Sequence, residues 1–101
     1  MTSTMVSPAA HAALVTGAGR RIGRAIALDL ARHGWAVAVH YNHSGDEAEE
    51  VAAVIRGQGG RAVAVRADLA DEGQTESLVA RATGALGPVT LLVNNASIFE
   101  R

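Results

Sequence analysis

The residues that say most about chemistry form a glycine-rich segment, Thr16-Gly17-Ala18-Gly19-Arg20-Arg21-Ile22-Gly23. A short apolar run precedes this segment and an amphipathic pattern follows it, which predicts a turn between a strand and a helix. Glycines in such a turn let the backbone approach a pyrophosphate, and the helix N-terminus offers N–H groups and a partial positive charge. We therefore predict a dinucleotide site. The alternative is that the glycines only close the turn and let the helix pack on the sheet.

A second polar segment, His40-Tyr41-Asn42-His43-Ser44, follows the next apolar run. A site for NAD usually places an Asp or Glu here to bind the ribose 2′-hydroxyl, and that carboxylate would repel a 2′-phosphate. This segment has none, and Arg20 or Arg21 can approach from the glycine turn, so we predict NADP(H) as the cofactor. The alternative is that Ser44 only caps a helix and His43 is a surface residue. A metal site at His40 and His43 has no evident third ligand, and we expect none.

Short apolar runs alternate with longer amphipathic ones, which is the pattern of βαβ units around a parallel sheet. Right-handed crossovers then predict an α/β fold, a doubly wound parallel sheet with strand order 3-2-1-4. The predicted strands are Ala12 to Thr16, Ala36 to Tyr41, Ala62 to Arg66 and Val89 to Asn94. As the fourth strand would stand at an edge of the sheet, we expect it to be exposed and apolar.

Three helices should connect these strands. The first should run from about Arg20 to His33, with Ile22, Ile26 and Leu30 on its buried face and Gly34 ending it. In the second, Ser44 and Glu47 predict a capping box at the start, the inner face carries Val51, Val54 and Ile55, and Gly57, Gly59 and Gly60 mark the end. The third should begin at Asp71, with Gln74 three residues later, run through Leu78, Val79, Ala82 and Leu86, and end at Gly87-Pro88.

The composition of the 101 residues, 49% hydrophobic and 19% charged, indicates a globular domain. No apolar run approaches the roughly 18 residues of a membrane span. The net charge of −1 favours neither nucleic acid nor membrane partners. Cysteine is absent and no secretory signal is evident, so we expect a cytoplasmic protein. Residues 1–11 are expected to be a flexible tail.

Three ordered motifs resemble the short-chain dehydrogenase/reductase family, whose members use a Rossmann fold and NAD(H) or NADP(H): Thr16-Gly17-x-x-x-Arg21-Ile22-Gly23, Asp68-Leu69 after the third strand, and Asn94-Asn95-Ala96-Ser97 after the fourth. Two departures, Arg21 where the family usually has Gly and Ser97 where its motif ends in Gly, resemble the pteridine reductase branch. The segment after the second strand resembles that branch too, although a stronger cation tends to stand where this chain has His43.

The resemblance implies roles for these residues. Asp68 and Leu69 would hold the adenine, and Asn95 and Ala96 would lie against the cofactor ribose. Arg21 would lie by the phosphates and the pterin, Ser97 would contact cofactor and substrate, and Phe99 would stack on the pterin. Structural alternatives stay open: Asp68 as a loop carboxylate, Asn95 as a tie between strands, and Phe99 as a cover for the core. The expected cofactor site therefore comprises Gly17, Arg20, Arg21, Ile22, Gly23, Tyr41, Asn42, His43, Ser44, Asp68, Leu69, Asn95, Ala96 and Ser97.

Family members reduce carbonyls or imines with a Tyr and a Lys four residues later. This sequence has no Lys, and its one Tyr, Tyr41, is followed four positions on by Gly45. We therefore expect no catalytic residue in this chain, and we interpret residues 12–101 as the N-terminal, cofactor-binding half of a reductase domain. A nick in the substrate loop at Arg101, with the C-terminal segment of the same gene product still docked, is expected.

The predicted activity is NADPH-dependent reduction of a pterin or dihydrofolate-like substrate. The alternatives are a ketoacyl or other small-carbonyl reductase, a nucleotide-binding module without catalysis, and an α/β scaffold without a ligand. The resemblance also implies a homo-oligomer, commonly a tetramer.

Overall fold

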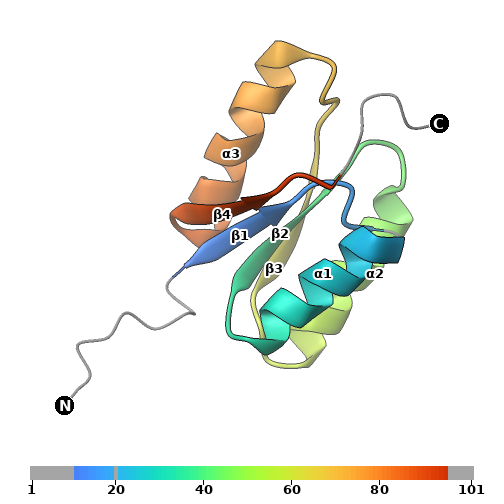
Figure 1. Ribbon diagram of the computed structural model, residues 1–101, viewed down its shortest axis with the longest axis vertical. Helices are drawn as coiled ribbons and strands as arrows, with labels where there is room; N and C mark the ends of the chain where they lie inside the picture. Colours follow the sequence, from blue (N-terminus) through green and yellow to red (C-terminus); the bar gives the residue numbers. More distant parts are fainter. Residues whose placement is uncertain (1–10, 20, 96–101) are drawn as a thin grey trace.

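The computed structural model describes residues 11–19 and 21–95. Within these ranges the chain alternates strands and helices throughout (Figure 1). The elements are β1 (Ala12–Val15), α1 (Arg21–Arg32), β2 (Ala36–Tyr41), α2 (Gly45–Gly57), β3 (Ala62–Arg66), α3 (Glu72–Leu86) and β4 (Val89–Val93). The first and fourth strands each end one residue earlier than predicted, although Thr16 N–H still donates to Val93 O at 3.0 Å.

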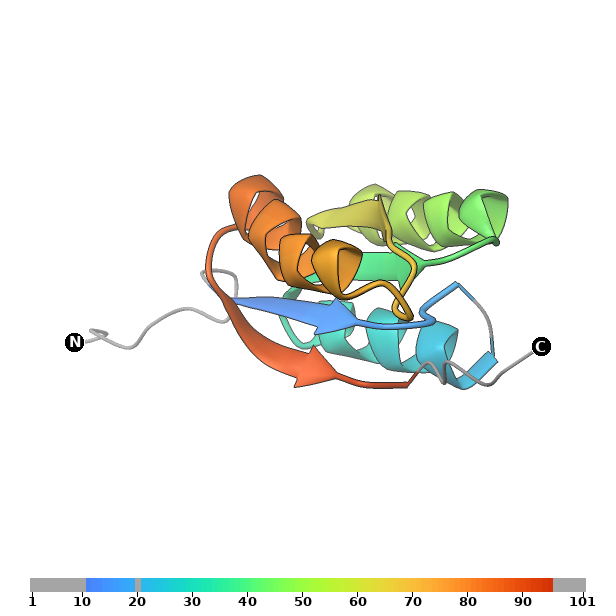
Figure 2. The same cartoon turned by 90° about the horizontal axis from the view of Figure 1, so that it is seen from above.

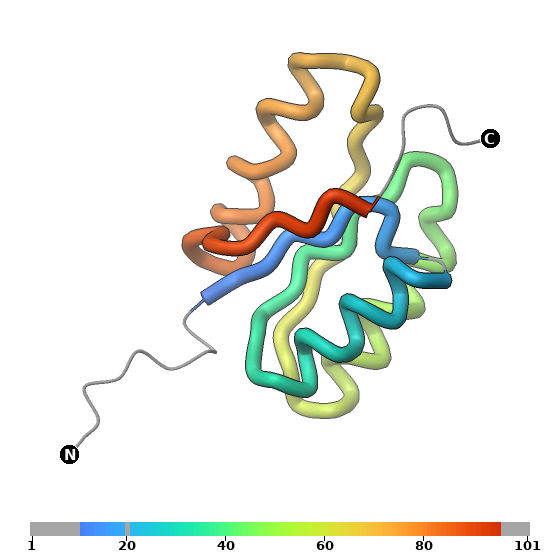
Figure 3. The backbone as a smooth tube through the Cα atoms, in the orientation of Figure 1, coloured from blue at the N-terminus to red at the C-terminus, as the bar shows by residue number. Residues whose placement is uncertain are grey.

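All neighbouring strands run parallel, in the order β3-β2-β1-β4, which confirms the predicted doubly wound topology. The first and last strands therefore lie side by side, as the backbone trace shows (Figure 3). The β1 to β2 register pairs Ala12 with Ala36 and Val15 with Val39. Because β1 is central and covered on both faces, all four of its residues are completely buried.

Helices cover both faces of the sheet, with α1 and α2 on one face and α3 on the other (Figure 1). Alternate residues of the strands therefore belong to two cores. Val15, Val37 and Val39 pack with α1 and α2, whereas Leu14, Ala36 and Ala38 pack with α3. Strands buried on both faces explain why their sequences are continuous apolar runs rather than alternating ones.

Helix α1 has a narrower buried face than its periodicity suggests. Ile26 and Leu30 pack against the core and Ala27 is fully buried, but Ile22 is 68% exposed. The prediction that Ile22 lies on the buried stripe is therefore wrong. Ile22 stands in the first turn of α1, next to the glycine turn, and belongs to neither core cluster.

The two predicted helix caps differ. Asp71 has an extended backbone and its Oδ1 accepts from Gly73 N at 2.9 Å and from Gln74 N at 3.3 Å, so it caps α3 as expected. Ser44 precedes α2 but makes no side-chain cap hydrogen bond, and its ψ of 58° departs from the extended geometry that caps adopt. The predicted capping box at Ser44 is therefore wrong.

Helix α3 and strand β4 leave apolar side chains at the surface. Leu78, Ala82 and Leu86 are buried, whereas Val79, on the same helix, is 42% exposed. On β4, Leu92 is 57% exposed. The expectation of an exposed, apolar edge strand is confirmed for β4.

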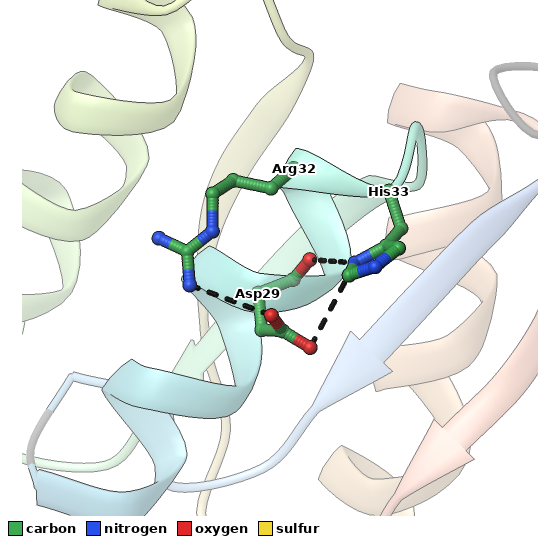
Figure 4. Close-up of polar contacts among 3 residues, drawn as sticks. All are labelled: Asp29, Arg32 and His33. Atoms are coloured by element: carbon green, nitrogen blue, oxygen red, sulfur yellow. Dashed lines mark hydrogen bonds and ion pairs between the residues drawn. The ribbon is translucent and has the colours of Figure 1, made fainter.

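The far end of α1 carries a small polar cluster. Asp29 Oδ1 accepts from Arg32 Nη2 at 3.4 Å, and His33 Nδ1 lies 2.8 Å from Asp29 O (Figure 4). Gly34 follows with a φ of 95°, which confirms that a glycine in the left-handed conformation ends this helix. Basic side chains at a helix C-terminus also interact favourably with its dipole.

The start of the described chain is tied to the sheet. His11 O accepts from Ala36 N at 3.2 Å, and the His11 ring lies 5.9 Å from the Trp35 ring. The other residues of the predicted tail, 1–10, lie outside the described residues. None of the described helices is long and apolar enough to cross a membrane.

Candidate functional site

Four segments that carry predicted site residues follow the four strands at their carboxyl ends. Because the strands are parallel, these segments meet along one edge of the sheet, where all the drawn strand arrows point (Figure 2). This edge is where doubly wound sheets bind ligands. The segments are the turn at Gly17–Gly19, the loop at 42–44, the stretch at 67–69 and the strand end at 94–95.

The glycine turn is bound tightly to the start of α1. Gly17 has a φ of 62°, in the left-handed region that favours glycine. A Cβ at Gly23 would overlap the carbonyl oxygen of Gly17 and would come within 2.7 Å of Asn95 Nδ2. A Cβ at Gly19 would stand 3.1 Å from Ala48 N of α2. The packing explanation for these glycines is therefore supported, and it is compatible with a ligand at the open side of the turn.

Arg21, the first residue of α1, has a φ of 50°. Among the described residues other than glycine, Arg21 alone has a positive φ. This conformation costs a residue with a side chain roughly 1–2 kcal/mol, and it explains physically why a glycine would suit this position. The Arg21 side chain is exposed, and with Gly19, Arg24, Glu47 and Glu50 it lines an open hollow of about 360 Å³ between α1 and α2.

His40, the fifth residue of β2, is 2% exposed and joins two of the site's segments. Its Nδ1 accepts from Gly17 N–H at 3.0 Å, and its Nε2 lies 2.9 Å from Ala67 O. Since Nδ1 accepts, Nε2 must carry the proton and donate to Ala67 O. Burial lowers the pKa of His40 below its usual value of 6.5, and the Arg81 guanidinium lowers it further, while the hydrogen bond to Ala67 opposes them.

The end of β4 is tied to the glycine turn by Asn95 and Thr16. Asn95 N–H donates to Thr16 Oγ1 at 2.9 Å, and Asn95 Nδ2 donates to Gly17 O at 3.3 Å. Thr16 is buried, whereas Asn95 is exposed. The alternative that Asn95 is a structural tie between strands is therefore supported by these contacts, although its exposed side chain can also meet a ligand.

The loop after β2 lines a second open hollow of about 620 Å³. Asn42 Oδ1 is buried there without a hydrogen-bond partner, while Asn42 O accepts from Arg66 Nε at 3.1 Å. A buried unpaired amide oxygen is rare and points to a missing partner. The residues that line the hollow are Tyr41, Asn42, His43, Ser44, Gly45, Asp46, Glu47 and Arg66, so two carboxylates as well as the Arg66 guanidinium face it.

Asp68 is half-buried in a turn that leads to α3. Its Oδ1 accepts from Ala70 N at 3.0 Å, and its N–H donates to Gln74 Oε1 at 2.8 Å. Gln74, expected to act in the helix cap, thus also holds the Asp68 backbone. The neighbouring Leu69 packs against the core on the α3 side. These contacts support the alternative that Asp68 is a loop carboxylate. Asp68 nevertheless lies in one of the four segments at the carboxyl edge of the sheet.

Four of the predicted site residues, Arg20, Ala96, Ser97 and Phe99, lie outside the described residues, as does Arg101. The described residues include no group of three or more His, Asp or Glu side chains that could hold a metal ion. Both ring nitrogens of His40 are instead engaged in hydrogen bonds with Gly17 N and Ala67 O.

The sequence interpretation missed the role of His40, which it considered only as a metal ligand. The partners of its ring stand 23 and 27 residues away along the chain. A histidine at the carboxyl end of an otherwise apolar buried strand was the available signal, because a buried imidazole requires polar partners.

The chain matches the short chain dehydrogenase family over residues 11–101, and it belongs to that family. The short-chain dehydrogenase/reductase homolog YusS of Bacillus subtilis is 43% identical over 86 residues, which cover 85% of this chain and 79% of YusS. The 3-oxoacyl-[acyl-carrier-protein] reductase FabG of Staphylococcus epidermidis is 44% identical over 88 residues, 87% of this chain and 36% of that protein.

Among solved structures, FolM alternative dihydrofolate reductase 1 from Brucella suis in complex with NADP is 52% identical, with a TM-score of 0.84. The match covers 92% of this chain and 37% of FolM. Apart from YusS, the chain thus spans about a third of the length of these relatives. The comparisons confirm the predicted family and Rossmann-type fold, and FolM is consistent with the pteridine reductase branch.

Proposed function

We propose that this chain is the nucleotide-binding part of an NADPH-dependent reductase that acts on a pterin or dihydrofolate-like ring. The observation that carries the proposal is the meeting of the glycine turn, the loop after β2, Asp68 and Asn95 at one edge of a parallel sheet. The 52% identity to FolM, an alternative dihydrofolate reductase in complex with NADP, supports the choice of cofactor and substrate class.

Two features of the described residues fit a bound dinucleotide. The glycine turn has no side chain between its backbone and the start of α1, and Gly23 cannot carry a Cβ there. The buried Asn42 Oδ1 lacks a partner beside the hollow after β2. A turn of the Asn42 side chain toward the hollow would bring its amide to a ligand, where the NH₂ can donate to a phosphate.

Under this proposal each segment binds a different part of the cofactor. The Gly17 turn, Arg20, Ile22 and the N-terminus of α1 hold the pyrophosphate. Asp68 and Leu69 hold the adenine, and Asn95 and Ala96 contact the ribose. Arg21 lies by the phosphates and the substrate, Ser97 contacts cofactor and substrate, and Phe99 stacks on the substrate ring.

The 2′-phosphate would lie in the hollow after β2. Tyr41, Asn42, His43 and Ser44 line it together with Arg66. The Ser44 hydroxyl is not used to cap α2, so it can donate to the phosphate. Asp46 and Glu47 line the same hollow and oppose an anion, so affinity must come from the nearby cations and hydroxyl groups.

When bound, NADPH supplies a hydride that reduces a double bond of the ring. A proton donor must complete that reduction. Because this sequence contains no Lys and its Tyr41 is not followed by one, we propose that the catalytic Tyr and Lys belong to a C-terminal segment of the same gene product. That segment would also cover the exposed β4 edge at Leu92. A cytoplasmic homo-oligomer, such as a tetramer, completes the proposal.

A ketoacyl reductase is the second candidate, and the 44% identity to FabG favours it. Steady-state oxidation of NADPH by the full-length gene product separates the two. We expect turnover with a dihydropterin and little with a ketoacyl thioester. Turnover with the thioester alone would replace the proposal by the second candidate. NADPH binding without turnover of either substrate would indicate a nucleotide-binding module and would overturn the proposed activity.

A further inference from the structure

The His40 side chain is the one connection, among the described side chains, that reaches from the glycine turn to the residue before Asp68. It spans β2, accepting from Gly17 N–H at 3.0 Å on one side and facing Ala67 O at 2.9 Å on the other. The backbone adds two parallel ties, since Ala18 N donates to His40 O and Ala67 N donates to Tyr41 O, both at 3.0 Å. The imidazole thus adds a side-chain tie between two walls of the proposed site, the Gly17 turn and the Ala67–Asp68 stretch.

The direction of both hydrogen bonds defines one protonation state. A backbone N–H can only donate and a carbonyl can only accept, so the imidazole is neutral, with its proton on Nε2. A second proton would go to Nδ1, where it would face the N–H of Gly17 donor to donor. The contact with Gly17 cannot survive this protonation.

We propose that His40 is a positioning residue for the nucleotide, and that its neutral, Nε2-protonated ring holds the Gly17 turn and the Ala67–Asp68 stretch at the separation that binding requires. This inference rests on the proposed function, because it assigns the pyrophosphate to the first wall and the adenine to the second. Protonation of the ring should release the turn and weaken NADPH binding in acid.

The surroundings of His40 oppose a second proton. From the turn after β1 and from β3, the groups that meet its ring are the Gly17 N–H and the Ala67 carbonyl. From α3, the charged group that acts on it is the Arg81 guanidinium, whose Nη2 donates to Arg66 O at 2.8 Å. Burial and this positive charge both favour the neutral ring. Binding should therefore be retained at neutral pH and lost as the pH falls below the usual histidine range.

The first test reads the tautomer directly by nitrogen NMR of histidine-labelled full-length gene product. The His40 resonance is assigned by its absence from His40→Asn. We expect the Nε2–H tautomer at neutral pH, with and without NADPH. The Nδ1–H tautomer, or a charged ring, would overturn the inference whether or not NADPH binds.

The second test measures the Kd of NADPH between about pH 8 and about pH 5 in wild type, His40→Asn, His40→Leu and His43→Gln. The Asn side chain can still accept from Gly17 N–H but does not titrate, whereas Leu leaves that donor unpaired. At neutral pH we expect His40→Leu to weaken binding by roughly tenfold to a hundredfold, and His40→Asn to restore most of it. Circular dichroism at each pH checks that the variants are folded.

The pH dependence of the Kd of NADPH tests the inference about His40 even if His40→Leu does not fold. The 2′-phosphate titrates in all three proteins, so its contribution to the loss of affinity in acid is common to them. Wild type and His43→Gln should lose more affinity than His40→Asn, because they keep the His40 ring. If His40→Asn has the acid profile of wild type, the inference is wrong. If neither wild type nor any variant binds NADPH at any pH while NMR shows the Nε2–H tautomer, the proposed function fails. That outcome differs from failure of the His40 inference, in which NADPH binds but the tautomer or the acid profile is not the one expected.

Discussion

A methyl group at Gly23 would overlap the carbonyl oxygen of Gly17, so the first turn of α1 rests directly on the backbone of the glycine turn. The same methyl group would press on Asn95 Nδ2, which donates to that carbonyl. Residues from the turn after β1, from α1 and from the segment after β4 therefore meet at a point where one carbon atom cannot be added. This contact makes the packing of α1 and the shape of the site inseparable.

Gly23→Ala should therefore lower the free energy of unfolding by about 1–3 kcal/mol, the usual cost of overpacking, and should weaken NADPH binding. Chemical denaturation measures the first effect and titration calorimetry the second. Gly84→Ala is the matched control. Gly84 lies within α3 with open space around the position of a Cβ, so the same change there should raise stability by about 1 kcal/mol and leave binding unchanged. Equal effects of the two variants would contradict the contact.

Arg21→Gly should separate stability from binding. Relief of the φ of 50° should raise the free energy of unfolding by up to about 1 kcal/mol, whereas loss of the guanidinium should weaken NADPH binding by roughly tenfold. Arg21→Asn is a useful companion, because Asn tolerates this conformation but carries no charge. If Arg21→Gly binds NADPH as tightly as wild type does, Arg21 has no part in holding the phosphates.

The unequal caps of α2 and α3 predict opposite behaviour for two similar substitutions. Asp71→Ala should lower the free energy of unfolding by about 1 kcal/mol, because Asp71 caps α3, and should leave the Kd of NADPH unchanged. Ser44→Ala removes no cap hydrogen bond, so it should leave stability almost unchanged while weakening NADPH binding. Parallel denaturation and titration of the two variants check both statements. A loss of stability in Ser44→Ala as large as that in Asp71→Ala would contradict this assignment.

Acid should destabilise the fold through His40 even without nucleotide. The pKa of His40 is lower in the folded protein than its usual value of 6.5, so below that value the unfolded chain binds more protons than the folded one. The stabilisation is complete above about pH 6.5 and is lost as the pH falls toward the folded pKa. Denaturation curves across this range should show that the free energy of unfolding falls more steeply with falling pH in wild type than in His40→Asn. Equal slopes would be evidence against a contribution of His40 to the acid sensitivity.

The order of the strands could be predicted from the sequence because it depends only on alternating patterns and on the handedness of crossovers. The helix faces were less predictable. Periodicity places Ile22 on the same stripe as Ile26 and Leu30, but it cannot show that the first turn of α1 lies outside both cores. Likewise, Ser44 and Asp71 stand in similar capping patterns, but they differ in backbone angles and in side-chain cap hydrogen bonds, neither of which the pattern records.

Candidate site segments could be predicted where a motif is local, whereas contacts that span the fold could not. The glycine turn and the loop after β2 were both predicted from short segments, and the structure brings them to one edge of the sheet. The roles of His40 and Gln74 depend on pairings that no local pattern records, since His40 meets Gly17 and Ala67, and Gln74 meets the backbone of Asp68. The left-handed conformation of Arg21 had an indirect signal, the glycine that the family usually has there.

Hydrogen–deuterium exchange of the full-length gene product, with and without NADPH, tests the location of the site most directly. We expect NADPH to slow exchange in the segments 17–19, 42–45, 67–69 and 94–95, which follow the four strands. Exchange at the opposite edge, in the turns at 33–35 and 58–61, should not change. Protection confined to that opposite edge, or no protection of the glycine turn under saturating NADPH, would contradict the account.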